Sequence, residues 1–265
     1  MNNKRLTTDA IRARKGGTPV VCLTAYTTPI AQVLDEHCDL LLVGDSLGMV
    51  LYGHSDTTQV DLATMIRHGQ AVMRGSERAC VVVDMPYGTY ETSPAQALEN
   101  ARIIQNETGC CAVKLEGGTD MAPAIAAIVQ AGIPLMGHIG LQPQSSPKEG
   151  GFKVKGRTDE SIQKLLADAK AVQDAGAFSV VIEGTVEPLS RQITGMLNIP
   201  TIGIGASPAC DGQILVTDDL LGLTPRQPKF VRKYADLRGV IGEAARAYAS
   251  DVTSGAFPGE DEVYR

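Results

Sequence analysis

The sequence predicts a single-domain (β/α)8 barrel, the TIM-barrel class of α/β fold. Eight short apolar runs alternate with segments of helical periodicity, which is typical of a parallel sheet built from βα units. The chain has 265 residues, close to the usual length of such a barrel. No linker or shift in composition divides the chain, so we expect one domain over residues 1–265.

A doubly wound open sheet is the alternative fold. The turn after the first expected strand lacks the GxGxxG pattern of dinucleotide-binding folds of that kind. A count of eight strands also suits a closed barrel better than an open sheet. The sequence therefore favours the barrel.

The first half of the chain begins with an N-terminal helical extension over residues 1–17. Thr8 or Asp9 is placed to cap a short helix that runs through Ile11 and Arg14. Apolar runs predict strands, and amphipathic segments between them predict helices. The strands are expected at 19–23, 40–43, 80–83 and 112–115, and the helices at 28–37, 61–74, from 94 and at 123–131.

The second half repeats the pattern and ends in a polar tail over residues 251–265. The segment 141–157, rich in Gly, Ser, Pro and Lys, is the longest irregular stretch. The strands are expected at 133–136, 178–182, 199–204 and 214–216, and the helices at 159–175, 186–197 and 230–248.

Composition restricts the classes of partner. The formal net charge of −6 argues against nucleic acid or an anionic membrane as the main partner. No apolar run approaches the roughly 18 residues of a membrane span, and residues 1–17 lack the apolar core of a secretory signal. The six cysteines form no CxxC pair, which favours reduced, buried thiols. We therefore expect a cytoplasmic protein that acts on small molecules.

Polar side chains capable of chemistry stand at the ends of five expected strands. Four of these strands end in an acid, at Asp45, Asp84, Glu116 and Glu183, and a fifth ends in His138. In a barrel the carboxyl ends of all strands meet at one mouth. Any one acid alone could be a helix cap, but four acids and a histidine together indicate an active site.

Clustered carboxylates repel one another unless a cation or a proton intervenes. Oxygen ligands favour a hard cation, and a site with few protein ligands and several waters suits Mg²⁺. Asp45 and Asp84 are the first candidates because short side chains at strand ends are held stiffly, and Glu116 is a ligand directly or through water. His138 as a ligand would favour zinc, a weaker case without cysteine partners.

The predicted chemistry is removal of a proton next to a carbonyl group. Mg²⁺ can chelate a 2-oxo acid and polarise its keto group, and a positioned base then removes the α-proton. Glu183 lies on a later strand than the expected ligands and is free for that role. Lys114 points to the same strand face as Glu116, where it can bind the substrate carboxylate; a Schiff-base lysine is the alternative.

A series of motifs resembles the ketopantoate hydroxymethyltransferase (3-methyl-2-oxobutanoate hydroxymethyltransferase) family, over about residues 5 to 260. Any one of these motifs is weak evidence, but their order and spacing are highly specific. They are Thr24-Ala25-Tyr26, Val43-Gly44-Asp45-Ser46-Leu47-Gly48-Met49, Asp84-Met85-Pro86, Val113-Lys114-Leu115-Glu116-Gly117-Gly118, Gly137 to Gln144, Gly150 to Arg157, Ile202 to Ala206 and Asp211 to Val216. The sequence departs from the family pattern at Gly184 and in the loop 144–149, and neither departure is expected to touch the metal ligands.

The resemblance implies a Mg²⁺-dependent transfer of a hydroxymethyl group from 5,10-methylenetetrahydrofolate to 3-methyl-2-oxobutanoate, which gives 2-dehydropantoate in pantothenate biosynthesis. By the family pattern, one Mg²⁺ per subunit is held by Asp45 and Asp84, with Glu116 directly or through water. Ser46 and Lys114 bind the 2-oxo acid together with Asp45 and Asp84, and Glu183 accepts the proton. Family members are cytoplasmic homodecamers. No motif identifies residues for the folate.

Two other functions are open at this point. Mg²⁺-dependent C–C lyases and mutases of the phosphoenolpyruvate mutase and isocitrate lyase group share the fold and the strand-end acids. They use a catalytic cysteine on a flexible loop, and the segment 141–157 contains no cysteine. A catalytically inactive barrel that serves in binding or assembly is the second alternative. It predicts that one of Asp45, Asp84, Lys114 or Glu183 would be replaced, and all four are present.

Overall fold

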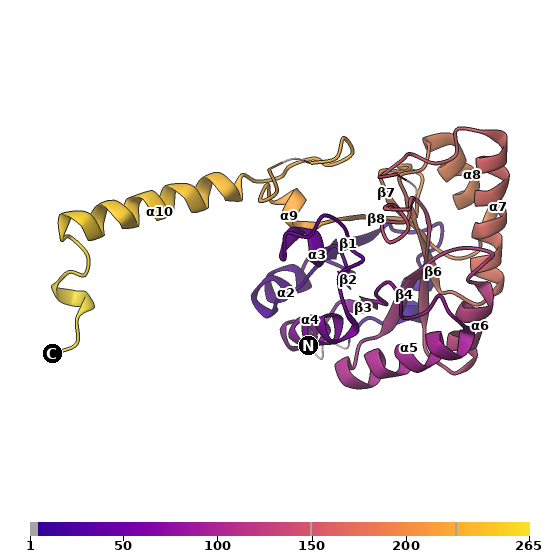
Figure 1. Cartoon of the computed structure of the whole chain (residues 1–265), viewed down its shortest axis with the longest axis horizontal. Helices are drawn as coiled ribbons and strands as arrows, with labels where there is room; N and C mark the ends of the chain where they lie inside the picture. The colour runs from indigo at the N-terminus through magenta and orange to yellow at the C-terminus, as the bar shows by residue number, and fades with distance from the viewer. Residues whose placement is uncertain (1–4, 149, 226) are drawn as a thin grey trace. The chain divides into compact units, whose positions relative to one another are not determined.

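The barrel consists of eight parallel strands in a closed ring, in the order of the sequence, in a computed structural model that describes residues 5–148, 150–225 and 227–265 (Figure 1). Each strand pairs with the next along the chain, and β8 pairs with β1. The predicted fold class is confirmed. The strands are β1 (Val20–Thr24), β2 (Leu40–Val43), β3 (Cys80–Asp84), β4 (Ala112–Glu116), β5 (Leu135–Gly140), β6 (Ser179–Glu183), β7 (Thr201–Ile204) and β8 (Gly212–Leu215).

Helices follow most of the strands and cover the outside of the barrel (Figure 1). Four of the main helices begin at a side chain that accepts a hydrogen bond from the first turn, including Asp61 before α4 and Ser93 before α5. The helices are α1 (Thr8–Arg12), α2 (Thr28–Asp35), α3 (Leu47–Val50), α4 (Leu62–Gly75), α5 (Pro94–Thr108), α6 (Ala122–Gln130), α7 (Asp159–Asp174), α8 (Glu187–Met196), α9 (Thr217–Leu220) and α10 (Leu237–Ser254).

The core has two layers because successive residues of a strand point to opposite faces of the sheet. In β2, Leu41 and Val43 pack in the larger apolar cluster together with helix residues such as Met65 of α4. Leu40 and Leu42 belong to the second cluster, which strand residues fill. Ile11 of α1 joins this second cluster. A chain buried on both faces of its strands reads as short, wholly apolar runs, which is why the strands were visible in the sequence.

The chain divides into two units, Met1–Val216 with the barrel and Thr217–Arg265 with α9, α10 and a short 3-10 helix at Glu260–Glu262. None of the residues of α10 is buried. No helix in the described part of the chain is long and apolar enough to cross a bilayer. All six cysteines are free thiols, and only Cys111 is not buried.

Several element boundaries differ from the sequence prediction; β8, for example, begins at Gly212 rather than at residue 214. The cap of α1 is Thr7, whose side chain accepts from the Ala10 N–H, rather than Thr8 or Asp9. Strand β5 runs over Leu135–Gly140 rather than 133–136, because Ile139 and Gly140 still pair with β6; its polar residue His138 contacts Glu116 and Glu183. The closing helix begins at Leu237, after the capping Asp236, rather than at residue 230.

Candidate active site

The mouth of the barrel brings the predicted residues together through the register of neighbouring strands. Asp84 at the end of β3 pairs in register with Lys114 of β4. Glu116 at the end of β4 pairs with His138 of β5, and Glu183 at the end of β6 pairs with Gly140. Because β2 lies next to β3, Asp45 directly after it completes the group. The sequence prediction that these side chains share one mouth follows from this register.

An ion pair and a backbone hydrogen bond join Lys114, Asp84 and Asp45. The Lys114 Nζ lies 2.9 Å from Asp84 Oδ1, and both side chains are almost fully buried. The other oxygen of Asp84 accepts a hydrogen bond of 3.1 Å from the Asp45 backbone N–H. The turn after β2 is thus fixed to the end of β3, and Lys114 supplies positive charge between the two carboxylates.

Ser46 is held by a tyrosine and does not cap a helix. It precedes α3, but its side chain makes no cap hydrogen bond there. Its Oγ lies 2.8 Å from the hydroxyl of Tyr26, which follows β1. The Tyr26 backbone carbonyl in turn contacts His68 Nδ1 at 2.6 Å. The hydroxyl of Ser46 therefore has a fixed position at the mouth, as a substrate-binding group requires.

Gln144 is a site residue that the sequence prediction missed. This buried side chain comes from the loop after β5, and its Nε2 donates to Asp45 Oδ2 at 2.8 Å and to the Met85 carbonyl at 3.0 Å. Its Oε1 accepts from the Tyr90 hydroxyl. The expectation that the loop 144–149 touches no metal ligand is therefore wrong at its first residue; Glu149 lies outside the described residues. Sequence spacing gave no signal, because a loop residue reaches the mouth by a path that strand periodicity does not encode.

Glu116, His138 and Glu183 form the second half of the cluster. The Nδ1 of His138 lies 3.5 Å from Glu116 Oε1, and its Nε2 lies 3.1 Å from Glu183 Oε2. Glu116 also accepts a hydrogen bond of 3.1 Å from the Gln144 backbone N–H. The side chain of Glu183 is 17% exposed, whereas those of Glu116 and His138 are buried. Of the three, Glu183 is the one open to a bound substrate.

Burial and crowding change the proton affinities of these groups. Burial and the Asp84 carboxylate raise the pKa of Asp45 to about 7, although Lys114 acts against them. Burial raises the pKa of Glu183 to about 7, again against Lys114. A carboxylate whose pKa lies near neutrality is suited to accept a proton from carbon.

The remaining two groups respond to the same charges. Burial and then Asp45 raise the pKa of Glu116 well above its usual range. Burial alone would lower the pKa of Lys114, but Asp84, Glu116 and Asp45 outweigh it and raise that pKa, so the ammonium stays charged. The mouth therefore has one fixed cation among groups that compete for protons.

The donor set fits a hard cation with few protein ligands. Within residues 5–148, 150–225 and 227–265, no group of three or more His, Cys, Asp or Glu side chains is placed to hold a metal ion by itself. Asp84 accepts from the Asp45 backbone N–H, and its charge raises the pKa of the Asp45 carboxyl, so two buried carboxylates lie near each other. Two such ligands with waters in the other positions suit Mg²⁺ rather than zinc.

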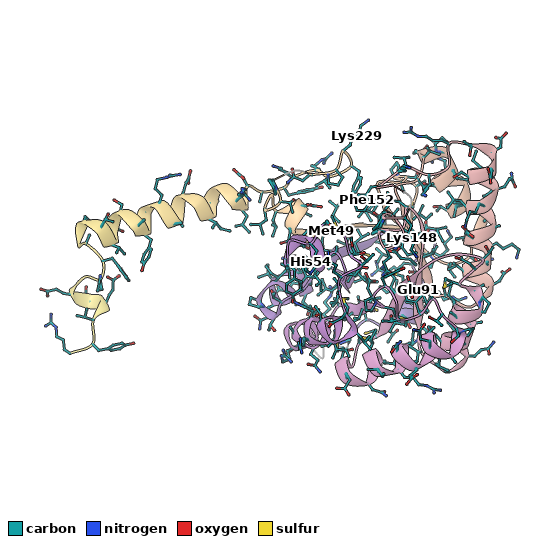
Figure 2. All side chains as sticks on the ribbon, in the orientation of Figure 1. Met49, His54, Glu91, Lys148, Phe152 and Lys229 are labelled. Carbon is teal, nitrogen blue, oxygen red and sulfur yellow. The ribbon has the colours of Figure 1, made fainter. Side chains whose placement is uncertain are left out.

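Loops at the carboxyl ends of the strands carry polar and aromatic side chains. Figure 2 labels Met49 and His54 after β2, Glu91 after β3, and Lys148 and Phe152 after β5. The Lys148 Nζ lies 5.1 Å from the centre of the Tyr87 ring. The Phe152 side chain is 54% exposed.

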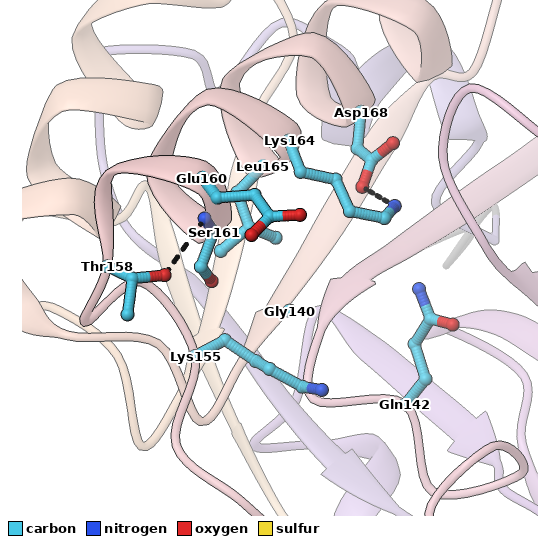
Figure 3. A pocket seen from close by; sticks show the side chains of 9 residues that line it. All are labelled: Gly140, Gln142, Lys155, Thr158, Glu160, Ser161, Lys164, Leu165 and Asp168. Carbon is cyan, nitrogen blue, oxygen red and sulfur yellow. Dashed lines mark hydrogen bonds and ion pairs between the residues drawn. The ribbon is translucent and has the colours of Figure 1, made fainter. Parts of the chain in front are cut away.

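A separate cavity of about 270 Å³ lies beside the end of β5 and the first half of α7 (Figure 3). Lys164 in its wall pairs with Asp168 at 2.6 Å, and Lys155 and Glu160 also line it. The positive charges of the two lysines and the negative charges of the two acids are equal in number there. The cavity contains none of the predicted site residues and favours neither an anion nor a cation.

The fold and the site together define a class of protein, a (β/α)8-barrel enzyme whose buried mouth is built for acid–base chemistry. A sequence model of the family "Ketopantoate hydroxymethyltransferase" matches residues 5–260. The chain belongs to this family, as its motifs predicted, and it is a transferase.

Individual relatives cover almost the whole chain. It is similar to the 3-methyl-2-oxobutanoate hydroxymethyltransferase of Mesorhizobium japonicum, with 64% identity over 98% of this chain and 91% of the relative. The enzyme of the same name from Agrobacterium fabrum is 59% identical over 99% of this chain and 94% of the relative. These identities favour the transferase over the lyase or mutase.

Solved structures agree on the fold. A phosphonopyruvate hydrolase crystallised with oxalate and Mg²⁺ superposes with a TM-score of 0.62 at 12% identity, over 97% of this chain and 93% of that one. A 2,3-dimethylmalate lyase of the PEP mutase/isocitrate lyase superfamily gives 0.60 at 18% identity, over 98% and 92%. At such identities the likeness concerns the barrel alone.

Proposed function

We propose that the mouth binds 3-methyl-2-oxobutanoate with one Mg²⁺ and transfers to it a hydroxymethyl group from 5,10-methylenetetrahydrofolate, giving 2-dehydropantoate for pantothenate biosynthesis. One observation carries the proposal: a buried Asp45–Asp84–Lys114 group faces Glu183, a carboxylate with a pKa of about 7, at one barrel mouth. Family membership supplies the identity of the reaction.

In this proposal the chain's own residues bind and orient the 2-oxo acid. Asp45 and Asp84 would hold the metal, and Glu116 would contact it directly or through water. Lys114 and Ser46 bind the substrate carboxylate, since an ammonium and a hydroxyl fixed by Tyr26 both donate hydrogen bonds. When bound, Mg²⁺ would polarise the keto group and so lower the barrier to loss of the neighbouring proton.

Glu183 is the proposed base. It takes the proton from C3 of the 2-oxo acid. Water cleaves both C–N bonds of the methylene carbon of the folate, so that tetrahydrofolate leaves and the carbon becomes formaldehyde. C3 then bonds to this carbon, whose oxygen takes up a proton and becomes the hydroxyl group. A base in this position contributes roughly 10²–10⁴-fold to the rate. Its pKa of about 7 keeps a large fraction of the carboxylate ready at neutral pH.

The test is deuterium exchange at C3 of 3-methyl-2-oxobutanoate in D₂O, followed by proton NMR with and without Mg²⁺. We expect exchange with Mg²⁺ and little without it, and product formation only when 5,10-methylenetetrahydrofolate is added. Absence of exchange with Mg²⁺ present would contradict the proposal. Release of glyoxylate or succinate from suitable 2-oxo or hydroxy acid substrates would support the lyase alternative instead.

We also propose that the protein forms a cytoplasmic homo-oligomer, the homodecamer that the family resemblance implies. The support is the second unit, in which α10 buries none of its residues and exposes Val240, Ile241 and Tyr248 by 52–61%. Apolar surface of this kind marks an interface. Light scattering after gel filtration should give about ten times the 28.0 kDa of one chain; a monomer mass would contradict the proposal.

A further inference from the structure

His138 lies at the centre of the mouth, between the proposed substrate-binding lysine and the proposed base, yet the reaction described above gives it no task. We propose that His138 positions Glu183: its neutral ring accepts a hydrogen bond from Lys114 at Nδ1 and presents its Nε2–H to Glu183 Oε2. This inference rests on the proposed role of Glu183 as the base.

The protonation of the ring follows from its surroundings. The Lys114 ammonium lies against Nδ1, where a ring protonated on both nitrogens would place an N–H, so the ring is neutral. One nitrogen of a neutral imidazole donates and the other accepts. Which nitrogen carries the proton must be assigned from the neighbours.

Lys114 fixes the assignment. Its Nζ lies 3.3 Å from His138 Nδ1, and an ammonium can only donate hydrogen bonds. A proton on Nδ1 would face the ammonium protons, so Nδ1 carries the lone pair and Nε2 carries the proton. The contact of Nδ1 with Glu116 Oε1 is longer, at 3.5 Å. The charged lysine therefore selects the Nε2–H form.

Glu183 is the carboxylate at contact distance from this N–H. The Nε2 and Glu183 Oε2 are 3.1 Å apart. In the free protein Nε2 has no hydrogen-bond partner among the described residues, so the 3.1 Å approach of Glu183 is not yet a hydrogen bond; the Leu141 backbone also interacts with the ring. Hydrogen bonds of catalytic groups are often poorly aligned in the free enzyme and tighten when substrate binds. Glu183 is the more exposed partner and has room to turn.

The consequence is a defined direction for the base. With Oε2 held by His138, the other oxygen of Glu183 is left to receive the proton from C3. A misplacement of about 1 Å in a catalytic group can cost on the order of a hundredfold in rate. Through its two contacts, His138 also connects Lys114 to the base. Because Lys114 binds the substrate carboxylate, one lysine positions both the substrate and the base.

Two substitutions of His138 separate its two contacts. In His138→Gln the amide reaches the position of Nε2 and keeps a donor for Glu183. In His138→Asn the shorter amide reaches the position of Nδ1 and keeps only the contact with Lys114. We expect C3 exchange to be at least tenfold faster in His138→Gln than in His138→Asn. The affinities of the two variants for 3-methyl-2-oxobutanoate, measured by calorimetry, should agree within a few-fold.

Equal exchange rates in the two variants, or exchange at the wild-type rate in His138→Asn, would overturn the positioning role. Glu183→Gln is the third variant, and it separates the two proposals. If it abolishes exchange while the two histidine variants match, the base stands and this inference falls. If it retains exchange, the proposed base itself is wrong.

The tautomer has its own spectroscopic test. The chain contains four histidines, so nitrogen-15 NMR of the histidine-labelled protein shows few signals, and the one lost in His138→Gln belongs to His138. We expect the chemical shifts of a neutral ring protonated at Nε2. A ring protonated at Nδ1 would overturn the assignment.

Discussion

Buried or half-buried aspartates occur at both ends of the barrel, but their pKa values shift in opposite directions. At the amino end, Asp35 accepts hydrogen bonds from Ser76 and from the backbone N–H groups of Glu77, Arg78 and Ala79. Burial works to raise the pKa of Asp35, but these donors lower it overall. At the mouth, burial and the neighbouring Asp84 raise the pKa of Asp45 to about 7.

A second acid at the amino end, Asp211, is likewise surrounded by hydrogen-bond donors. Asp211 pairs with Lys15 at 2.9 Å and accepts from the backbone N–H groups of Gly16 and Thr201 at 2.9 and 2.8 Å. Burial opposes the effect, yet these donors lower the pKa of Asp211. At the mouth, Glu183 lies 3.1 Å from His138 Nε2, and burial raises its pKa although Lys114 acts against the effect.

The difference shows how one fold divides stability from reactivity. An acid surrounded by donors is stable as an anion and holds the chain together. Acids that share one lysine compete for protons and for a cation, which is the condition of a site that binds charged ligands. The competing acids lie at the carboxyl ends of the strands, where barrels of this class have their chemistry.

The largest effect should come from removing a charge at the mouth. Asp84→Asn leaves Lys114 without its closest ion-pair partner and removes a proposed metal ligand. We expect binding of both Mg²⁺ and 3-methyl-2-oxobutanoate to weaken by about 3 kcal/mol, more than a hundredfold. Calorimetry measures both, with Asp174→Asn on the exposed face of α7 as the control. Unchanged affinity for either ligand would contradict the role of Asp84.

A change at the amino end should lower stability and spare the chemistry. Asp211→Ala leaves Lys15 and the N–H groups of Gly16 and Thr201 without their acceptor. We expect the free energy of unfolding to fall by about 2 kcal/mol in urea titrations, with C3 exchange per folded molecule unchanged. The exposed Asp174→Ala should change stability by less than about 0.5 kcal/mol. A loss of exchange in folded Asp211→Ala would contradict the claim that acids at the amino end serve stability alone.

The smallest effect is a difference in pH dependence. The folded-state pKa of Asp45 and of Glu183 is about 7, above the ordinary values of 3.8 and 4.5. Such groups stabilise the folded state below their unfolded pKa, and this contribution is lost as the pH rises through about 7. Asp35 and Asp211 have lowered pKa values, so their contribution is lost only as the pH falls below 3.8.

The metal-free protein should therefore lose stability between pH 5 and pH 8. Asp45→Asn keeps an acceptor for Gln144 but cannot ionise, so it should reduce that loss. Urea unfolding at several pH values measures the slope for wild type and variant. Identical slopes would show that the pKa of Asp45 is not raised in the folded protein.

The sequence could predict the strands and most of the site for one physical reason. Parallel strands buried on both faces are short apolar runs, and the first polar residue after each run must lie at the mouth. This rule placed Asp45, Asp84, Glu116 and Glu183 without any structure. Lys114 followed from the period of two along β4.

The same rule explains what it missed. Gln144 and Tyr90 come from loops, where no period fixes the direction of a side chain, and they reach Asp45 and Glu116 through tertiary contacts. Strand β5 was predicted too short because His138 looked like an end, although it points into the site from within the strand. The closing helix was predicted too early because the capping Asp236 gives a weaker signal than the apolar residues before it.

The most direct measurement is the rate of deuterium exchange at C3 of bound 3-methyl-2-oxobutanoate in Glu183→Gln, with Mg²⁺ present. Glu187→Gln on the exposed face of α8 is the matched control. We predict that Glu183→Gln binds the 2-oxo acid as the wild type does but exchanges its C3 proton roughly 10²–10⁴-fold more slowly. Exchange at the wild-type rate in Glu183→Gln would contradict the assignment of the base, and with it the central claim that the mouth performs proton transfer.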